Sequence, residues 1–232
     1  MDSKTPLQGL KRKAPLAPDE GYRRTAAGFI AKSETCTPVA TNGDIIVYTP
    51  DTPLINSKKS AEQGNHARFL VSSRHLALAS PYFKAMLRDC WAEGSALSEK
   101  GYTEIPVKEC KPDILLIVLN IIHGRSQQVP KKLSLQQLTN IAVITDFFQC
   151  NEAIVMAAKT WKAAIEKRSP LFPSSVSPAI KIKSWILISS VFGFHDTHKL
   201  VTKIAMQEGT GPLMTDALPI PKHTKGVPDR RS

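Results

Sequence analysis

Short apolar runs in the first half of the chain predict three β-strands. Residues 45–48 are consecutive apolar, mostly β-branched side chains, a composition typical of a strand buried on both faces. Residues 68–71 predict a second strand that can pair antiparallel with the first, and residues 102–105 predict a third, which ends at Pro106. The polar stretch at 57–65, between the first two strands, is predicted as an exposed loop.

Helical periodicity and capping residues follow the second strand. Ser72 or Ser73 supplies the N-cap of a short helix, and Ser80, which precedes a proline, begins the next one. Residues 112–122 are apolar almost all round, which predicts a central buried helix that Gly124 ends in a left-handed conformation. Further helices are predicted at 134–148 (opened by a capping box of Ser134 and Gln137), 151–168 (capped by Asn151), 180–194 and 197–206, whereas the Gly-punctuated residues 89–101 are predicted as a loop.

Proline and serine content divides the chain into five parts. The chain has 17 prolines and 12 glycines, and many of the prolines gather near the two ends and around residues 170–178. Segments of this composition are typical of linkers and disordered arms. We therefore expect, in order, a disordered basic N-terminal arm (1–41), one folded domain (42–168), a Pro/Ser linker (169–178), a helical extension (179–208) and a disordered tail (209–232).

The chain is basic, with 31 Lys and Arg against 20 Asp and Glu and a formal net charge of +11. Such a charge raises the alternative of a nuclear, nucleic-acid-associated regulatory protein that uses its basic tails. The excess is dispersed, since residues 1–41 carry seven basic and four acidic side chains and the rest is scattered. A dispersed excess mostly solvates a surface, so we do not expect nucleic acid as the partner. Lys11, Arg12 and Lys13 form a candidate nuclear-import patch, for which a solvated basic tail is the simpler interpretation.

Cysteine usage and targeting signals favour an intracellular protein. The cysteines Cys36, Cys90, Cys110 and Cys150 are far apart and form no C-x-x-C pair, and no signal peptide opens the chain. Free thiols of this kind fit a reducing compartment, so we expect a cytoplasmic or nuclear location. The longest apolar run, at 114–122, is too short to cross a bilayer, so we expect no membrane association.

No arrangement of polar residues in the sequence predicts an active site. His195 and His198 have a spacing found in metal sites, but no third ligand lies near them in sequence, so we expect no metal. Cys90 has no base or anchoring group beside it, and no phosphate-binding loop or nucleophile elbow occurs. We therefore expect a chain that is not an enzyme and that uses no cofactor and no small-molecule substrate.

One block of the sequence has the order and chemistry of a known family. An aspartate precedes the first predicted strand, and an apolar and serine-containing pattern runs from the second strand into the helix that begins at Ser80. The residues that carry this pattern are Asp44, Phe69, Ser72, Leu76, Ser80, Tyr82 and Phe83. With two strands, two helices, a strand and three helices in that order, residues 42–168 resemble a BTB/POZ domain, in particular the small BTB-only proteins of filamentous fungi.

The resemblance implies an α+β fold, in which a helical cluster is capped by a small three-stranded sheet and followed by a C-terminal helical extension. It also implies a protein–protein interaction module for homo- or hetero-association, either with itself or as an adaptor to a cullin-type ubiquitin ligase. Some relatives bind the cullin scaffold through the helical side of the domain and the extension behind it. Many relatives dimerise through a strand and a helix before the first core strand, where this chain is rich in proline and charge.

Overall fold

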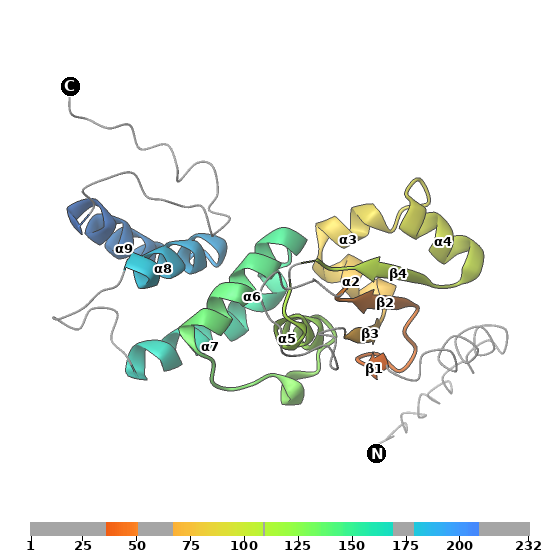
Figure 1. The fold of residues 1–232 in the computed structure, drawn as a ribbon, viewed down its shortest axis with the longest axis horizontal. Helices are drawn as coiled ribbons and strands as arrows, with labels where there is room; N and C mark the ends of the chain where they lie inside the picture. Colours follow the sequence, from red (N-terminus) through yellow and green to blue (C-terminus); the bar gives the residue numbers. More distant parts are fainter. Residues whose placement is uncertain (1–35, 51–66, 109, 169–178, 209–232) are drawn as a thin grey trace, which may run out of the picture.

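A computed structural model of the chain describes residues 36–50, 67–108, 110–168 and 179–208. A small sheet lies at one end of a helical cluster, and the last two helices lie at the opposite end (Figure 1). This is the α+β architecture expected from the sequence, with a sheet that is larger than expected.

The strands are β1 (Cys36–Pro38), β2 (Ile45–Tyr48), β3 (Arg68–Val71) and β4 (Thr103–Pro106). Within the described residues they form one four-stranded sheet in the order β1-β3-β2-β4. β2 and β3 pair antiparallel, as predicted, with Ile45 opposite Val71. β1 is parallel to β3 and β4 is parallel to β2, so both edge strands run parallel to their neighbours.

The prediction of three strands was wrong, because β1 adds an edge strand inside the segment that we expected to be disordered. The N–H groups of Val39 and Ala40 both donate to Leu70 O, at 2.9 and 3.0 Å. The guanidinium of Arg125 donates to Pro38 O at 2.7 Å. A three-residue strand is too short to show an alternating pattern, and these distant partners hold it in place. Residues 1–35 of the predicted arm lie outside the described residues.

The central helix is α5 (Pro112–Ile122), which is buried on most of its surface, as predicted from its apolar composition. Gly124, two residues beyond the end of this helix, has a φ of 69°, in the left-handed conformation that was expected there. The capping box of Ser134 and Gln137 is also present at the start of the next α-helix. The described helices are α2 (Ser73–Ala79), α3 (Pro81–Met86), α4 (Ala92–Lys100), α5 (Pro112–Ile122), η1 (Ser126–Gln128), α6 (Leu135–Phe148), α7 (Asn151–Arg168), α8 (Ala179–Val191) and α9 (His195–Glu208).

The prediction of a loop over 89–101 was wrong, because residues 92–100 form α4. The glycine that suggested a loop, Gly94, is buried, and a Cβ at this position would lie 2.0 Å from Arg88 O. Close approach of the backbone therefore explains why a glycine stands inside this helix. Gly101, with a φ of 74°, ends the helix in the left-handed conformation.

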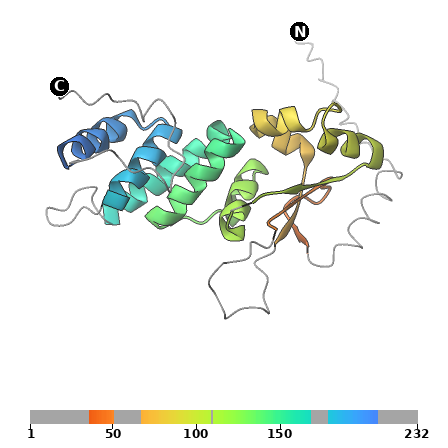
Figure 2. The ribbon, with the colours of Figure 1, turned by 45° about the horizontal axis from the view of Figure 1, so that its top comes forward.

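The extension of α8 and α9 packs onto the rest of the domain. α8 lies against α6, and α9 lies against α8, beyond the α6–α7 pair (Figure 2). Asn151, predicted as a cap, is the first residue of α7, and its side-chain N–H donates to Val191 O at the end of α8, at 2.7 Å. Trp185 and Ile188 of α8 belong to the same apolar cluster as α5 and α6. One continuous core therefore extends from the sheet to α9.

Candidate functional site

The first turn of α2 is held by side chains from distant parts of the chain. Asp44 accepts two hydrogen bonds from Ser73, one from the backbone N–H at 2.7 Å and one from the hydroxyl at 2.6 Å. The N-cap residue, Ser72, makes no side-chain cap, and its backbone N–H donates to His123 Nε2 at 3.0 Å. Asp44 therefore caps α2 in place of the serines that the sequence suggested.

Replacing Asp44 with alanine is expected to lower the free energy of unfolding by about 2–3 kcal/mol, because two hydrogen bonds to a charged acceptor are lost. Chemical denaturation followed by circular dichroism measures this change. Ser73→Ala is the matched control, since it removes only the hydroxyl bond and is expected to cost about 1 kcal/mol. An Asp44→Ala protein as stable as the wild type would contradict this role.

The remaining signature residues pack α2 and α3 onto the core. Leu76 and Phe83 are completely buried, and Phe69 is nearly so. The hydroxyl of Ser80 accepts from Phe83 N–H at 3.1 Å, as an N-cap does, and also donates to Phe148 O at the end of α6. Ser80 therefore caps α3 and fixes it to α6 with one side chain.

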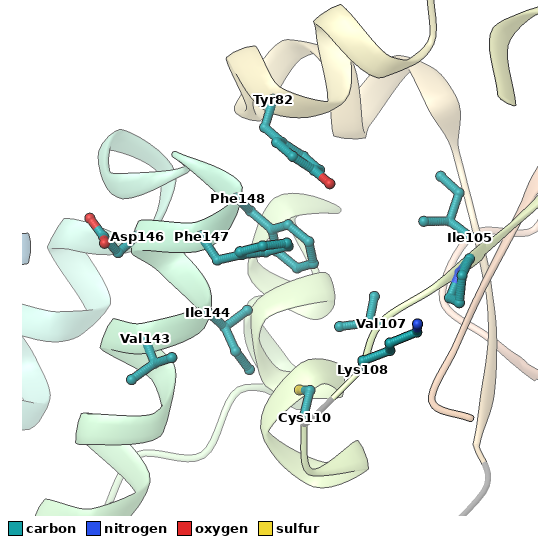
Figure 3. A pocket seen from close by; sticks show the side chains of 11 residues that line it. Tyr82, Ile105, Val107, Lys108, Cys110, Val143, Ile144, Asp146, Phe147 and Phe148 are labelled. Atoms are coloured by element: carbon teal, nitrogen blue, oxygen red, sulfur yellow. The ribbon is translucent and has the colours of Figure 1, made fainter. Parts of the chain in front are cut away.

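Tyr82 is the signature residue that faces a surface groove. The groove has a volume of about 460 Å³ and lies between α3, β4, the segment before α5, and α6 (Figure 3). Its lining is mostly apolar, and the centroids of the Tyr82 and Phe147 rings lie 5.3 Å apart. The lining residues are Tyr82, Ile105, Pro106, Val107, Lys108, Cys110, Val143, Ile144, Asp146, Phe147 and Phe148.

The polar groups of the groove do not form a reactive centre. Burial, and secondly the charge of Asp113, raise the pKa of the Cys110 thiol to about 12. This thiol therefore stays protonated at neutral pH, when it is a poor nucleophile. Burial also raises the pKa of the Asp146 carboxyl above its ordinary value. With Lys108 exposed on the opposite side (Figure 3), the groove is suited to binding an apolar side chain.

Other residues considered in the sequence lie apart from this groove. His198 Nδ1 lies 3.0 Å from Ser189 Oγ, which is a local contact between α8 and α9, while His195 is exposed. Cys90 is exposed, as is Trp91 beside it. The search for metal sites over the described residues finds no group of three His, Cys, Asp or Glu side chains that could hold an ion. The candidate import patch Lys11, Arg12 and Lys13 lies outside the described residues.

The groove itself was missed in the sequence. Its most exposed aromatic side chain is Phe147, which is 59% exposed. The other phenylalanine of the same helix, Phe148, is only 1% exposed. Two adjacent aromatic residues near a helix end indicate that one of them must face away from the core, because neighbours on a helix lie about 100° apart. That signal predicts an exposed ring, but it does not indicate which other elements surround it.

None of the described helices is long and apolar enough to span a membrane.

Comparison with known proteins finds one domain family that matches part of the chain. Residues 62–164 match the family model described as the BTB/POZ domain. No curated protein matches the chain. Among solved structures, the BTB (Tramtrack and Bric a brac) domain of human Gigaxonin is similar, with 13% sequence identity over 65% of this chain and 98% of that chain and a TM-score of 0.32. From the family match over residues 62–164, we conclude that this chain contains a BTB/POZ domain, a protein–protein interaction module.

Proposed function

We propose that this BTB/POZ domain acts without catalysis, by binding an apolar side chain of a protein partner in the groove between α3, β4 and α6. The observation that carries this proposal is the exposure of Phe147, at 59%, beside a groove lined by Tyr82 and Val107. An aromatic side chain left in water beside an apolar groove is typical of an interaction surface.

The partner we propose is a cullin-type scaffold of a ubiquitin ligase, for which the chain would be an adaptor. The groove is formed by the helical side of the domain, and α6, which lines it, also carries α8 of the extension. A partner that lies along α6 can therefore contact both the groove and the extension. Self-association through the same groove is the other form of this proposal, and the oligomeric state distinguishes the two.

The proposal also includes an intracellular location, which rests on the thiols, and a relationship to fungal BTB proteins, which rests on the sequence. All four cysteines are free, although Cys36, Cys90 and Cys110 are at least partly exposed. Such thiols favour an intracellular location, where the environment is reducing. The order of motifs from Asp44 to Phe83 supports an assignment to the small BTB proteins of filamentous fungi.

Replacing Phe147 with aspartate is expected to weaken binding of a cullin N-terminal domain by about thirtyfold, because a central aromatic contact contributes about 2 kcal/mol. Isothermal titration calorimetry with purified cullin N-terminal domains measures the affinity. The fold is expected to survive, since Phe147 is largely exposed and surface substitutions change the unfolding free energy by about 0.5 kcal/mol.

Met156→Asp is the matched control, because Met156 is an apolar side chain of α7 that is 69% exposed and does not line the groove. It is expected to leave the affinity unchanged. Sedimentation velocity on the same proteins tests self-association, which Phe147→Asp disrupts if the groove is the contact. A wild-type chain that binds no cullin domain and stays monomeric at high concentration overturns the proposal.

A further inference from the structure

The imidazole of His123 joins the end of α5 to the start of α2 through both of its ring nitrogens. Nδ1 lies 2.8 Å from Leu119 O, which can only accept, so Nδ1 carries the proton. Nε2 accepts from the backbone N–H of Ser72, at 3.0 Å. The two contacts together fix the neutral form of the ring, because a protonated Nε2 has no lone pair to accept with.

The titratable and charged neighbours of His123 are mostly basic. His75, on α2, stacks on it with ring centroids 5.0 Å apart and an angle of 25° between the planes. Arg125 follows α5, and its guanidinium donates to Pro38 O of β1. Asp44, before β2, is the acidic group among these neighbours, and its carboxylate is already bonded to Ser73. A proton on His123 would therefore add a positive charge beside His75 and Arg125.

We propose that His123 and His75 form an acid-sensitive switch, in which neutral His123 holds the first turn of α2 and protonated His123 releases it. On protonation, the Nε2–H and Ser72 N–H groups become two donors that face each other across 3.0 Å. The Ser72 amide then loses its acceptor. The Ser72 side chain makes no cap hydrogen bond that would hold the start of α2 in place of this contact. Protonation of His123 therefore affects the start of α2. Asp44 still accepts from the Ser73 amide there.

The direction of the pH dependence follows from burial. Burial lowers the pKa of His123 below its ordinary value of 6.5, and the charges of His75 and Arg125 lower it further, against opposing contributions from Leu119 O and Asp44. The unfolded chain therefore binds a proton at higher pH than the folded chain does. The stability that His123 contributes is complete above its unfolded pKa and is lost as the pH falls through its lowered folded pKa.

The test is an NMR titration of the full chain together with amide hydrogen exchange, corrected for the intrinsic exchange rate at each pH. The Cε1–H resonance of His123 is expected to titrate below pH 6.5. The protection factor of the Ser72 amide is expected to fall by about tenfold for each pH unit below that pKa, because the neutral fraction falls by this factor. His75→Ala is expected to raise the pKa of His123, since a neighbouring charge of the same sign is removed.

Two variants separate the switch from general acid unfolding. His123→Gln keeps an amide oxygen that can accept from Ser72 but cannot titrate, so its Ser72 protection is expected to be independent of pH. His198→Gln is the matched control, because His198 is another partly buried histidine with a hydrogen-bonding neighbour, Ser189. It is expected to keep the pH dependence of the wild type. If His123→Gln does not fold, the wild type still decides: a His123 pKa at or above 6.5, or Ser72 protection unchanged between pH 7.5 and 5, overturns the proposal.

Discussion

Replacing Phe83 with alanine is expected to lower the free energy of unfolding by about 3–5 kcal/mol. The side chain has no exposed surface, and its ring lies 4.6 Å from the Phe148 ring and 5.6 Å from the Tyr82 ring. Its removal leaves a cavity between α3 and α6. Because a domain is typically stable by only about 5–15 kcal/mol, a loss of this size is a large part of the total stability. Urea denaturation followed by tryptophan fluorescence measures it.

Leu78→Ala is the control for the Phe83 substitution. Leu78 is an apolar side chain on the neighbouring helix α2, but it is 89% exposed, so its truncation is expected to change the unfolding free energy by less than about 0.5 kcal/mol. Phe83→Leu keeps part of the volume and is expected to cost roughly 1–2 kcal/mol. A Phe83→Ala protein within about 1 kcal/mol of the wild type would show that α3 does not pack against α6 as described.

Replacing Trp161 with alanine is expected to destabilise the domain by a similar amount, about 3–5 kcal/mol. The indole is 1% exposed in the core face of α7, and its Nε1–H donates to Pro130 O at 2.7 Å. The substitution therefore removes apolar contacts and also leaves a carbonyl without its partner. Both losses fall at the point where α7 meets the segment between η1 and α6.

Trp161→Phe separates these two losses. Phenylalanine keeps most of the apolar contact but has no N–H group, so this variant is expected to lose about 1–2 kcal/mol for the unpaired Pro130 carbonyl. Equilibrium denaturation of both variants gives the two values. Equal effects of Trp161→Phe and Trp161→Ala would mean that the hydrogen bond outweighs the packing, and no effect of either would refute the burial of α7.

Most of the helical part of the domain could be predicted because its signals are local. The apolar composition of residues 112–122, the capping box at Ser134 and the serine–proline pair at Ser80 each lie within one or two helical turns. Such patterns determine the secondary structure from neighbouring residues alone. The signature from Asp44 to Phe83 then indicated the family, which the match over residues 62–164 supports.

β1 and α4 were missed because their causes lie outside their own residues. β1 exists through the bonds of Val39 and Ala40 to Leu70 and of Arg125 to Pro38. α4 contains a glycine that is unfavourable in an isolated helix by about 1 kcal/mol, and the close approach of Arg88 O explains it. The conformational preferences of the residues in these two segments predicted a loop or disorder. Contacts with distant parts of the chain outweighed those preferences.

The sequence by itself determined most of the helices and the strands β2, β3 and β4, since these depend on residues that are near one another along the chain. Only the tertiary structure decided that Tyr82 of α3 and Phe147 of α6 line one groove, and that His123 accepts from Ser72 across 51 residues. Sequence spacing carries no information about such pairs, because the chain between them can fold in many ways. Their proximity is set by how α3, α5 and α6 pack around a common core.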